Sequence, residues 1–197
     1  MPTTDRKLRV FLCHSSQDKP IVRELYQRLS AEGWIDPWLD EEKLLPGQDW
    51  HMEIEKAVET ADAVIVCLSK NSVTKDGYVQ RELKYILDIA LEKPEGTIFI
   101  IPSRLDDCQV PRQIRGWQWV DFFPKSNWEF GYQKVIKSLE KRILNLIKIS
   151  KGDEMLSDGS RLEWIQKNVI RVGKGKISET DYKIRNEKSD EGKKKNY

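Results

Sequence analysis

The feature that most constrains the fold is an alternation of short apolar runs with longer segments whose apolar residues recur at helical spacing. Repeated strand–helix alternation with short connections is typical of a parallel sheet that is covered by helices on both faces. We therefore predict an α/β fold with a flavodoxin-like five-stranded parallel sheet in the order 2-1-3-4-5. The predicted strands are Leu8–Cys13, Trp34–Leu39, Ala63–Leu68, Thr97–Ile101 and Gln118–Phe122.

Several residues refine this scheme. Ala63–Leu68 is the most uniformly apolar run, so it is expected at the centre of the sheet. Pro37 lacks an N–H donor and places the second strand at an edge. Asp18 is predicted to cap the first helix and Gly33 to end it. Asp40–Gly47 is predicted to be a polar loop with a Pro-Gly turn.

Periodicity and charge divide the chain into two parts. The helical pattern is clearest over Trp128–Lys148, which predicts a domain over residues 1–148. Residues 149–197 carry 12 Lys/Arg and 9 Asp/Glu and are predicted to be a charged tail, partly helical or disordered. The whole chain has a net charge of +2, which gives no basic excess for a nucleic-acid partner.

The composition also bears on the compartment. No run reaches membrane-spanning length and the N-terminus has no apolar signal region, so we expect a soluble protein without membrane contact. Cys13, Cys67 and Cys108 form no CxxC or zinc pattern. Cys13 and Cys67 each end an apolar run and are interpreted as buried free thiols, which fits a cytoplasmic location.

Familiar catalytic signatures are missing from the sequence. It contains no nucleotide-binding glycine loop of the GxGxxG or GxxxxGK[ST] type, no GxSxG elbow and no HExxH zinc motif. His14 and His51 are its only histidines, and no further residues complete a metal site. Carboxylates and hydroxyls remain as the candidate reactive groups.

Topology nevertheless indicates where a site would lie. In the assumed strand order, ligands bind beyond the carboxyl ends of the first and third strands. The loops there, His14–Asp18 and Ser69–Gly77, are rich in hydroxyl groups. Tyr78 and Glu82 are four residues apart early in the following helix and therefore share a face. On spacing alone, a glutamate near a helix N-terminus more often only complements the helix dipole.

Motifs along the chain change that balance. They are FLCHSSQDK at Phe11–Lys19, WLD at Trp38–Asp40, LPG at Leu45–Gly47 with Trp50, the apolar strand through Ser69 with Ser72, and the stretch from Ser72 to Leu83. In this order and spacing they resemble bacterial TIR (Toll/interleukin-1 receptor-like) domains of the NAD-cleaving type. The resemblance covers about Lys7 to Phe123.

The resemblance implies an NAD⁺ nucleosidase that cleaves the nicotinamide–ribose bond to give nicotinamide and ADP-ribose or a cyclic product. It places the catalytic glutamate at Glu82, with NAD⁺ as substrate and no metal or further cofactor. It also implies an immune or antiphage effector that self-assembles through the loop at residues 40–47, with an upstream sensor protein or nucleotide as trigger. The implied substrate-binding residues are His14, Ser15, Ser16, Trp38, Asp40, Leu45, Ser69, Ser72 and Tyr78.

Two departures and two alternatives accompany this hypothesis. Tyr78 stands where the family has tryptophan, which indicates either a retuned pocket or reduced activity. Cys13 stands where serine is common. A non-catalytic scaffold that recruits partners through TIR–TIR contacts is the main alternative. A nucleoside deoxyribosyltransferase of related fold is a further one, against which the pattern of residues 40–47 argues.

Overall fold

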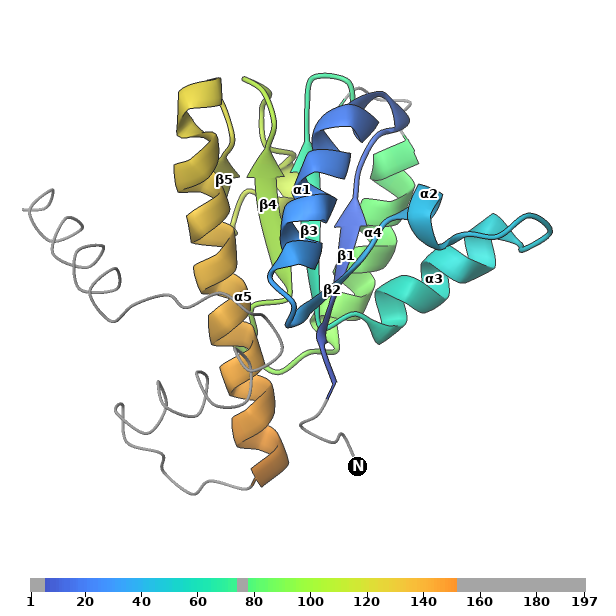
Figure 1. The fold of residues 1–197 in the computed structure, drawn as a ribbon, viewed down its shortest axis with the longest axis vertical. Helices are drawn as coiled ribbons and strands as arrows, with labels where there is room; N and C mark the ends of the chain where they lie inside the picture. Colours follow the sequence, from blue (N-terminus) through green and yellow to red (C-terminus); the bar gives the residue numbers. More distant parts are fainter. Residues whose placement is uncertain (1–5, 74–77, 152–197) are drawn as a thin grey trace, which may run out of the picture.

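A five-stranded parallel sheet forms the centre of the molecule in the computed structural model, which describes residues 6–73 and 78–151 (Figure 1). The strand order is β2-β1-β3-β4-β5, so the predicted topology is confirmed. The strands are β1 (Leu8–Cys13), β2 (Ile35–Trp38), β3 (Ala63–Leu68), β4 (Ile100–Arg104) and β5 (Val120–Asp121). As predicted, β3 is central and β2, which contains Pro37, lies at an edge.

Helices cover both faces of the sheet (Figure 1). Helices α1 (Lys19–Ala31) and α5 (Trp128–Lys151) pack on one face. Helices α3 (Trp50–Thr60) and α4 (Tyr78–Leu91) pack on the other. The remaining helical elements are the short α2 (Asp40–Lys43) and the 3₁₀ turns Ser16–Asp18, Arg112–Ile114 and Lys125–Asn127.

Side chains at alternate positions along a strand enter opposite cores. Along β1, Val10 and Leu12 belong to the core under α1 and α5, whereas Phe11 and Cys13 belong to the core under α3 and α4. This follows from the two-residue period of a strand, which sends neighbouring side chains to opposite faces. All six residues of β3 are buried, as a central strand of a doubly covered sheet requires.

Strand boundaries differ most from the prediction in the second half of the sheet. The fourth strand was expected at Thr97–Ile101 but occupies Ile100–Arg104, three residues later. The prediction followed the apolar run and stopped before Pro102. In the structure Pro102 lies inside the strand, and β5 pairs only with the two residues after it, Ser103 and Arg104. The lost N–H of proline therefore falls where no β5 residue is opposite.

The segment after β2 is also different from the prediction. A polar loop was expected over Asp40–Gly47, but Asp40–Lys43 forms the single-turn helix α2. Three acidic residues in its first turn favour a helix N-terminus. Arg23 of α1 binds Glu41 with an Nε–Oε1 distance of 2.8 Å and holds α2 against α1.

The rest of the chain bears on the predicted domain limits. Helix α5 continues to Lys151, and the predicted tail beyond that residue lies outside the described residues. Gly33 follows α1 with φ of 77°, which confirms its predicted role in ending that helix. No helix in the described part of the chain is both long and apolar enough to cross a bilayer.

Candidate active site

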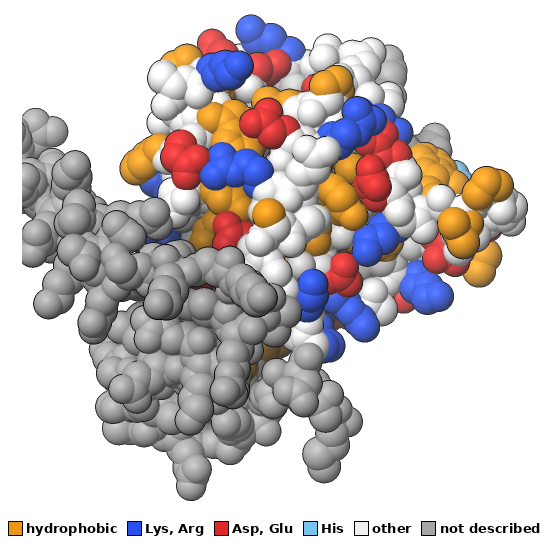
Figure 2. All heavy atoms as spheres, viewed as in Figure 1, with side chains coloured by type: hydrophobic (Ala, Val, Ile, Leu, Met, Phe, Trp, Pro, Cys, Tyr) orange, Lys and Arg blue, Asp and Glu red, His pale blue; other side chains and the backbone are white. Residues whose placement is uncertain are grey.

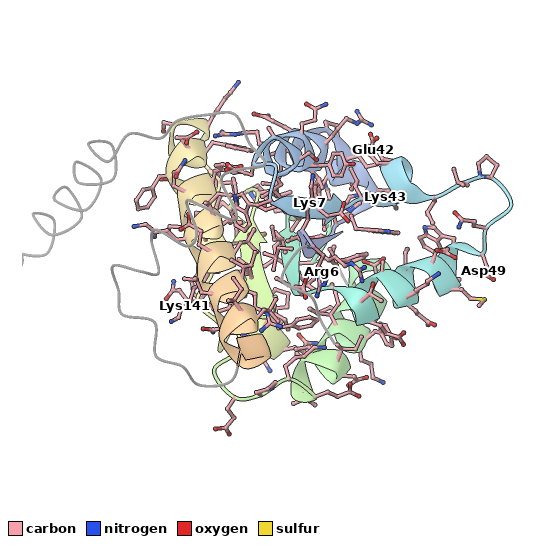
Figure 3. The ribbon with its side chains drawn as sticks, turned by 60° about the horizontal axis from the view of Figure 1, so that its bottom comes forward. Arg6, Lys7, Glu42, Lys43, Asp49 and Lys141 are labelled. Atoms are coloured by element: carbon pink, nitrogen blue, oxygen red, sulfur yellow. The ribbon has the colours of Figure 1, made fainter. Side chains whose placement is uncertain are left out.

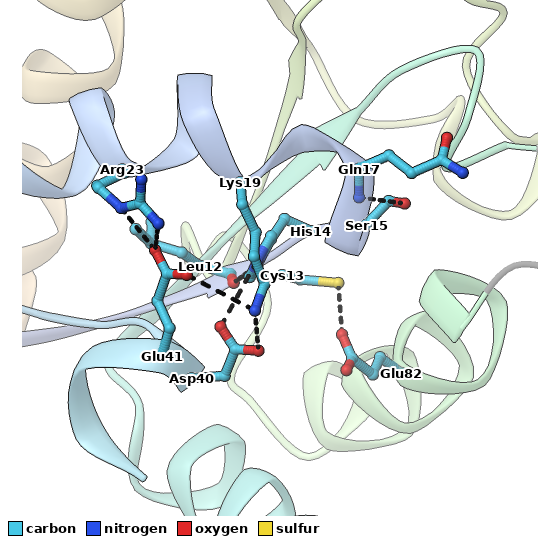
Figure 4. Close-up of polar contacts among 10 residues, drawn as sticks. All are labelled: Leu12, Cys13, His14, Ser15, Gln17, Lys19, Arg23, Asp40, Glu41 and Glu82. Atoms are coloured by element: carbon cyan, nitrogen blue, oxygen red, sulfur yellow. Dashed lines mark hydrogen bonds and ion pairs between the residues drawn. The ribbon is translucent and has the colours of Figure 1, made fainter.

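Glu82 lies early in α4, beside the carboxyl end of β1 (Figure 4). Its side chain is buried, and only 8% of the residue is exposed. The Cys13 thiol, at the last position of β1, donates a hydrogen bond to Glu82 Oε2 over 3.1 Å. A residue of the facing strand β1 thus binds the carboxyl group.

Burial decides the protonation state of this carboxyl group. Desolvation raises the pKa of Glu82 to about 8, and the nearby charge of Asp40 adds to the increase. The hydrogen bond from Cys13 acts in the opposite direction and lowers this pKa. The pKa of the Cys13 thiol is itself raised far above its usual value, first by burial and then by the charge of Glu82. Cys13 therefore remains a thiol and a hydrogen-bond donor.

His14 and Asp40 form the second part of the site (Figure 4). His14 Nδ1 lies 3.1 Å from the Leu12 carbonyl oxygen, which can only accept, so Nδ1 carries a proton and donates it. His14 Nε2 lies 3.6 Å from Asp40 Oδ1. Lys19 Nζ approaches the other oxygen, Asp40 Oδ2, at 3.4 Å.

This arrangement leaves an unsatisfied acceptor in the protein. Asp40 Oδ1 is buried and has no hydrogen-bond partner among the described residues. A buried acceptor without a donor is unfavourable, so a donor that reaches Asp40 Oδ1 would be stabilised there. The hydroxyl groups of a bound ligand are donors of the required kind.

The serines expected at the site are engaged with the protein itself. Ser69 and Ser72 are buried and bond each other through a closed turn, in which Ser69 N–H donates to Ser72 Oγ over 2.7 Å. Ser69 Oγ donates to Asp18 Oδ2 over 2.6 Å and so joins the loops after β1 and β3. The prediction that Asp18 caps α1 is wrong in this respect, because its side chain makes no capping bond and accepts from Ser69 instead.

The other expected site residues are spread more widely. Ser15 accepts a bond from Gln17 N–H at 3.5 Å, and Ser16 is exposed at the start of the following turn. Trp38 stacks on Phe11 with ring centroids 5.0 Å apart. The Leu45 residue is 68% exposed on the segment between α2 and α3. Tyr78 begins α4, but its side chain lies outside the described residues.

Two hollows on the described surface lie apart from the Glu82 carboxyl. The larger, of about 490 Å³, is lined by the last residue of β4 and the segment that leads from it to β5, and includes Arg104, Arg115 and Trp119. The smaller, of about 160 Å³, lies between Trp38 and α3. Of the expected site residues, these two hollows include only Trp38.

Sequence reasoning missed two residues of the constellation. Cys13 was interpreted as a buried free thiol; the structure confirms its burial, as well as that of Cys67, and adds the contact with Glu82. Lys19 was not singled out, although it approaches Asp40 from the first turn of α1. Strand parity offered a signal for Cys13, because it shares with Phe11 the face that α4 covers.

Comparison with known proteins identifies the class. The TIR domain family model matches residues 10–136, and the chain belongs to this family. The TIR domain of the Toll-related receptor TRR-2 from Hydra magnipapillata superposes with a TM-score of 0.55 at 19% identity, over 68% of this chain and 98% of that one. This likeness supports the fold alone.

Two curated relatives extend the comparison. The uncharacterized protein y4cD of Sinorhizobium fredii is 28% identical over 134 residues, which are 68% of this chain and 20% of that protein. The NAD(+) hydrolase TcpA of a Theionarchaea archaeon is 34% identical over 94 residues, which are 47% of this chain and 27% of that protein. The aligned parts are thus only about a fifth and a quarter of these relatives.

Proposed function

We propose that this TIR domain is an NAD⁺ nucleosidase and that Glu82 is its catalytic residue. The observation that carries the proposal is a buried carboxyl group at the carboxyl edge of β1 and β3, where an α/β sheet places its ligands. The match to an archaeal NAD(+) hydrolase over 47% of the chain supports the same substrate. NAD⁺ is the substrate in this proposal, and no metal or further cofactor takes part.

The proposed reaction requires few protein groups. The bond between ribose C1′ and the nicotinamide nitrogen breaks, and its electron pair neutralises the positive charge of the nicotinamide ring. The ribosyl group becomes oxocarbenium-like, and the Glu82 carboxylate stabilises its positive charge. Attack by water and loss of a proton then give ADP-ribose, while attack by a ring nitrogen of the adenine gives a cyclic product.

The raised pKa of Glu82 is compatible with this role. The ionised carboxylate is the active form, and the cationic nicotinamide of bound NAD⁺ favours ionisation of a neighbouring carboxyl group. In the free protein this pKa is about 8, so kcat/KM is expected to rise with pH through that value. In this proposal the unsatisfied Asp40 Oδ1 accepts from a substrate hydroxyl group, and His14 Nε2 beside it is a further polar contact for the substrate.

Access to the carboxyl group connects catalysis with assembly. A residue that is 8% exposed cannot receive a nucleotide without rearrangement, so the proposal includes a change that uncovers Glu82. Self-association through residues 40–47 would provide it, because α2 carries Asp40 beside the site. In this proposal further residues complete the substrate-binding surface of the assembled state. They are Ser15, Ser16, Trp38, Leu45, Ser69, Ser72 and Tyr78.

The biological setting follows from the same proposal. An enzyme that depletes NAD⁺ only when assembled suits an immune or antiphage effector in the cytoplasm. Its trigger would be a separate sensor protein or a nucleotide signal. A non-catalytic scaffold remains the competing function, since the exposed Leu45, Trp50 and Met52 would serve TIR–TIR contacts without any catalysis.

The decisive experiment measures nicotinamide release from NAD⁺ by concentrated protein. Glu82→Ala is expected to reduce kcat/KM by at least about a hundredfold, because it removes the group that stabilises the transition state. Asp88→Ala is the matched control, since Asp88 is an exposed carboxylate on the same helix. Full activity in Glu82→Ala would refute the assignment of the residue, and an inactive parent protein under assembling conditions would favour the scaffold.

A further inference from the structure

We propose that Cys13 is a positioning residue for Glu82: its thiol holds one carboxyl oxygen in place and leaves the other to meet the substrate. The inference rests on the proposed nucleosidase function and adds a residue to its machinery. The hydrogen bond joins Cys13 Sγ to Glu82 Oε2 over 3.1 Å (Figure 4). No hydrogen bond of Oε1 to a described residue accompanies it, so Oε1 is the oxygen that the substrate would meet.

The backbone of Cys13 is held firmly enough for such a role. Cys13 ends β1, and its Cα is in register with Val66 of the central strand β3. The residue is fully buried, with 0% exposed, so its side chain has no solvent to bind. Its thiol has Glu82 as its only hydrogen-bond partner among the described residues. A rigid donor of this kind fixes the rotamer of the flexible glutamate side chain.

Charge gives the contact a second consequence. The hydrogen bond from Cys13 favours the ionised carboxylate and opposes the effect of burial on the pKa of Glu82. Removing the donor should therefore raise the pKa of Glu82, so that the carboxyl group ionises only at higher pH. A side chain that merely filled space would, when truncated, leave the pKa of Glu82 unchanged or lower it by admitting water.

The chain contains a matched control for packing. Cys67 lies on the neighbouring strand β3 and is also 0% exposed, but its side chain belongs to the opposite core, under α1 and α5. It has no side-chain hydrogen bond to Glu82. Cys67→Ala therefore creates the same loss of volume as Cys13→Ala without removing the proposed donor.

The experiment records kcat/KM for nicotinamide release against pH for the full chain and for Cys13→Ala, Cys13→Ser and Cys67→Ala. Cys13→Ala is expected to move the midpoint up by about one pH unit and to lower kcat/KM at pH 7 about tenfold, because fewer molecules carry the carboxylate. Cys13→Ser supplies a hydroxyl donor and is expected to restore the parent midpoint. Cys67→Ala should keep the parent midpoint.

A second measurement separates this inference from the proposed function. NMR of ¹³C-labelled glutamate, with Glu82→Gln to identify the signal, reports the titration of Glu82 without substrate. If the parent protein releases no nicotinamide, the nucleosidase proposal fails, and an unshifted titration in Cys13→Ala would separately overturn the contact's role. Equal loss of rate in Cys13→Ala and Cys67→Ala with unchanged midpoints would also overturn it, because packing alone would then explain both.

Discussion

At the scale of single residues, the buried Glu82 carboxyl makes the stability of the fold depend on pH. Its pKa is about 8 in the folded protein, against an ordinary value of 4.5 in the unfolded chain. Between these values the folded state binds more protons, so its stability falls as pH rises through this window. The full difference corresponds to about 5 kcal/mol as an upper bound, reached above pH 8.

The substitution Glu82→Gln tests this linkage. Glutamine keeps an oxygen that can accept from Cys13 but has no charge to bury, so the variant should be more stable than the parent at pH 9. At pH 4 both should have similar free energies of unfolding. Urea unfolding at pH 4, 7 and 9 gives the comparison. Asp88→Asn on the exposed side of α4 serves as the control, and a constant difference between Glu82→Gln and the parent at all three pH values would contradict the buried, neutral carboxyl.

The residue scale is also where sequence reasoning was least complete. Glu82 could be located because its motif and its spacing from Tyr78 are both local features. Its hydrogen bond with Cys13 has no local signal, because Cys13 is 69 residues earlier in the chain. The Asp18–Ser69 bond has the same origin, since it joins loops that only the folded sheet brings together.

At the scale of elements, α5 approaches β5 closely at Gly131. A Cβ atom added at Gly131 of α5 would lie 2.6 Å from the backbone oxygen of Asp121 in β5. That oxygen also accepts a hydrogen bond from Asn127, at 2.8 Å, which limits its freedom to move. Glycine at this position therefore permits an approach that any other residue would prevent.

Gly131→Ala should accordingly destabilise the fold. We expect a loss of about 1–3 kcal/mol, because a backbone-to-backbone clash outweighs the higher helix propensity of alanine. Gly116→Ala is the control, since a Cβ at Gly116 would meet nothing within 4 Å. Denaturant unfolding of both variants gives the measurement, and equal midpoints for the two would show that α5 shifts freely over the sheet edge.

Element boundaries illustrate what local pattern can and cannot establish. The runs at β1 and β3 were predicted to the residue, because each apolar run coincides with its strand and all its residues except Arg9 are buried. The position of β4 depended on pairing with β3 through Pro102, a long-range contact without a local signal. Helix α2 depended similarly on its ion pairs with α1.

At the scale of the whole molecule, one segment projects from the body. Figure 1 shows the chain between α2 and α3 extending away from the sheet, and Figure 3 places Lys43 at its beginning and Asp49 at its end. Hydrophobic side chains gather at this end of the face drawn in Figure 2. Leu45 is 68% exposed and Met52 66% exposed there. The topology that positions this segment was predictable, because strand order and helix alternation are encoded along the entire domain.

This segment carries the last prediction, which concerns assembly. Exposing a leucine to water is unfavourable, and this cost is removed when a second copy of the protein covers the side chain. Leu45→Asp should therefore weaken self-association, and, if assembly uncovers Glu82, nicotinamide release should fall with it by about tenfold or more at high protein concentration. Its backbone N–H donates to Gln48 and is unaffected by the change, so the folded domain should retain its stability within about 0.5 kcal/mol.

Leu91→Asp is the matched control for this prediction. Leu91 is 84% exposed at the end of α4, so the variant makes the same chemical change at a different place. Sedimentation velocity and specific activity, both measured over a range of protein concentrations, should show parent-like behaviour for Leu91→Asp and a monomeric, weakly active Leu45→Asp. Assembly and activity that survive in Leu45→Asp would separate residues 40–47 from self-association. Loss of assembly with full activity would instead show that a single copy can uncover Glu82.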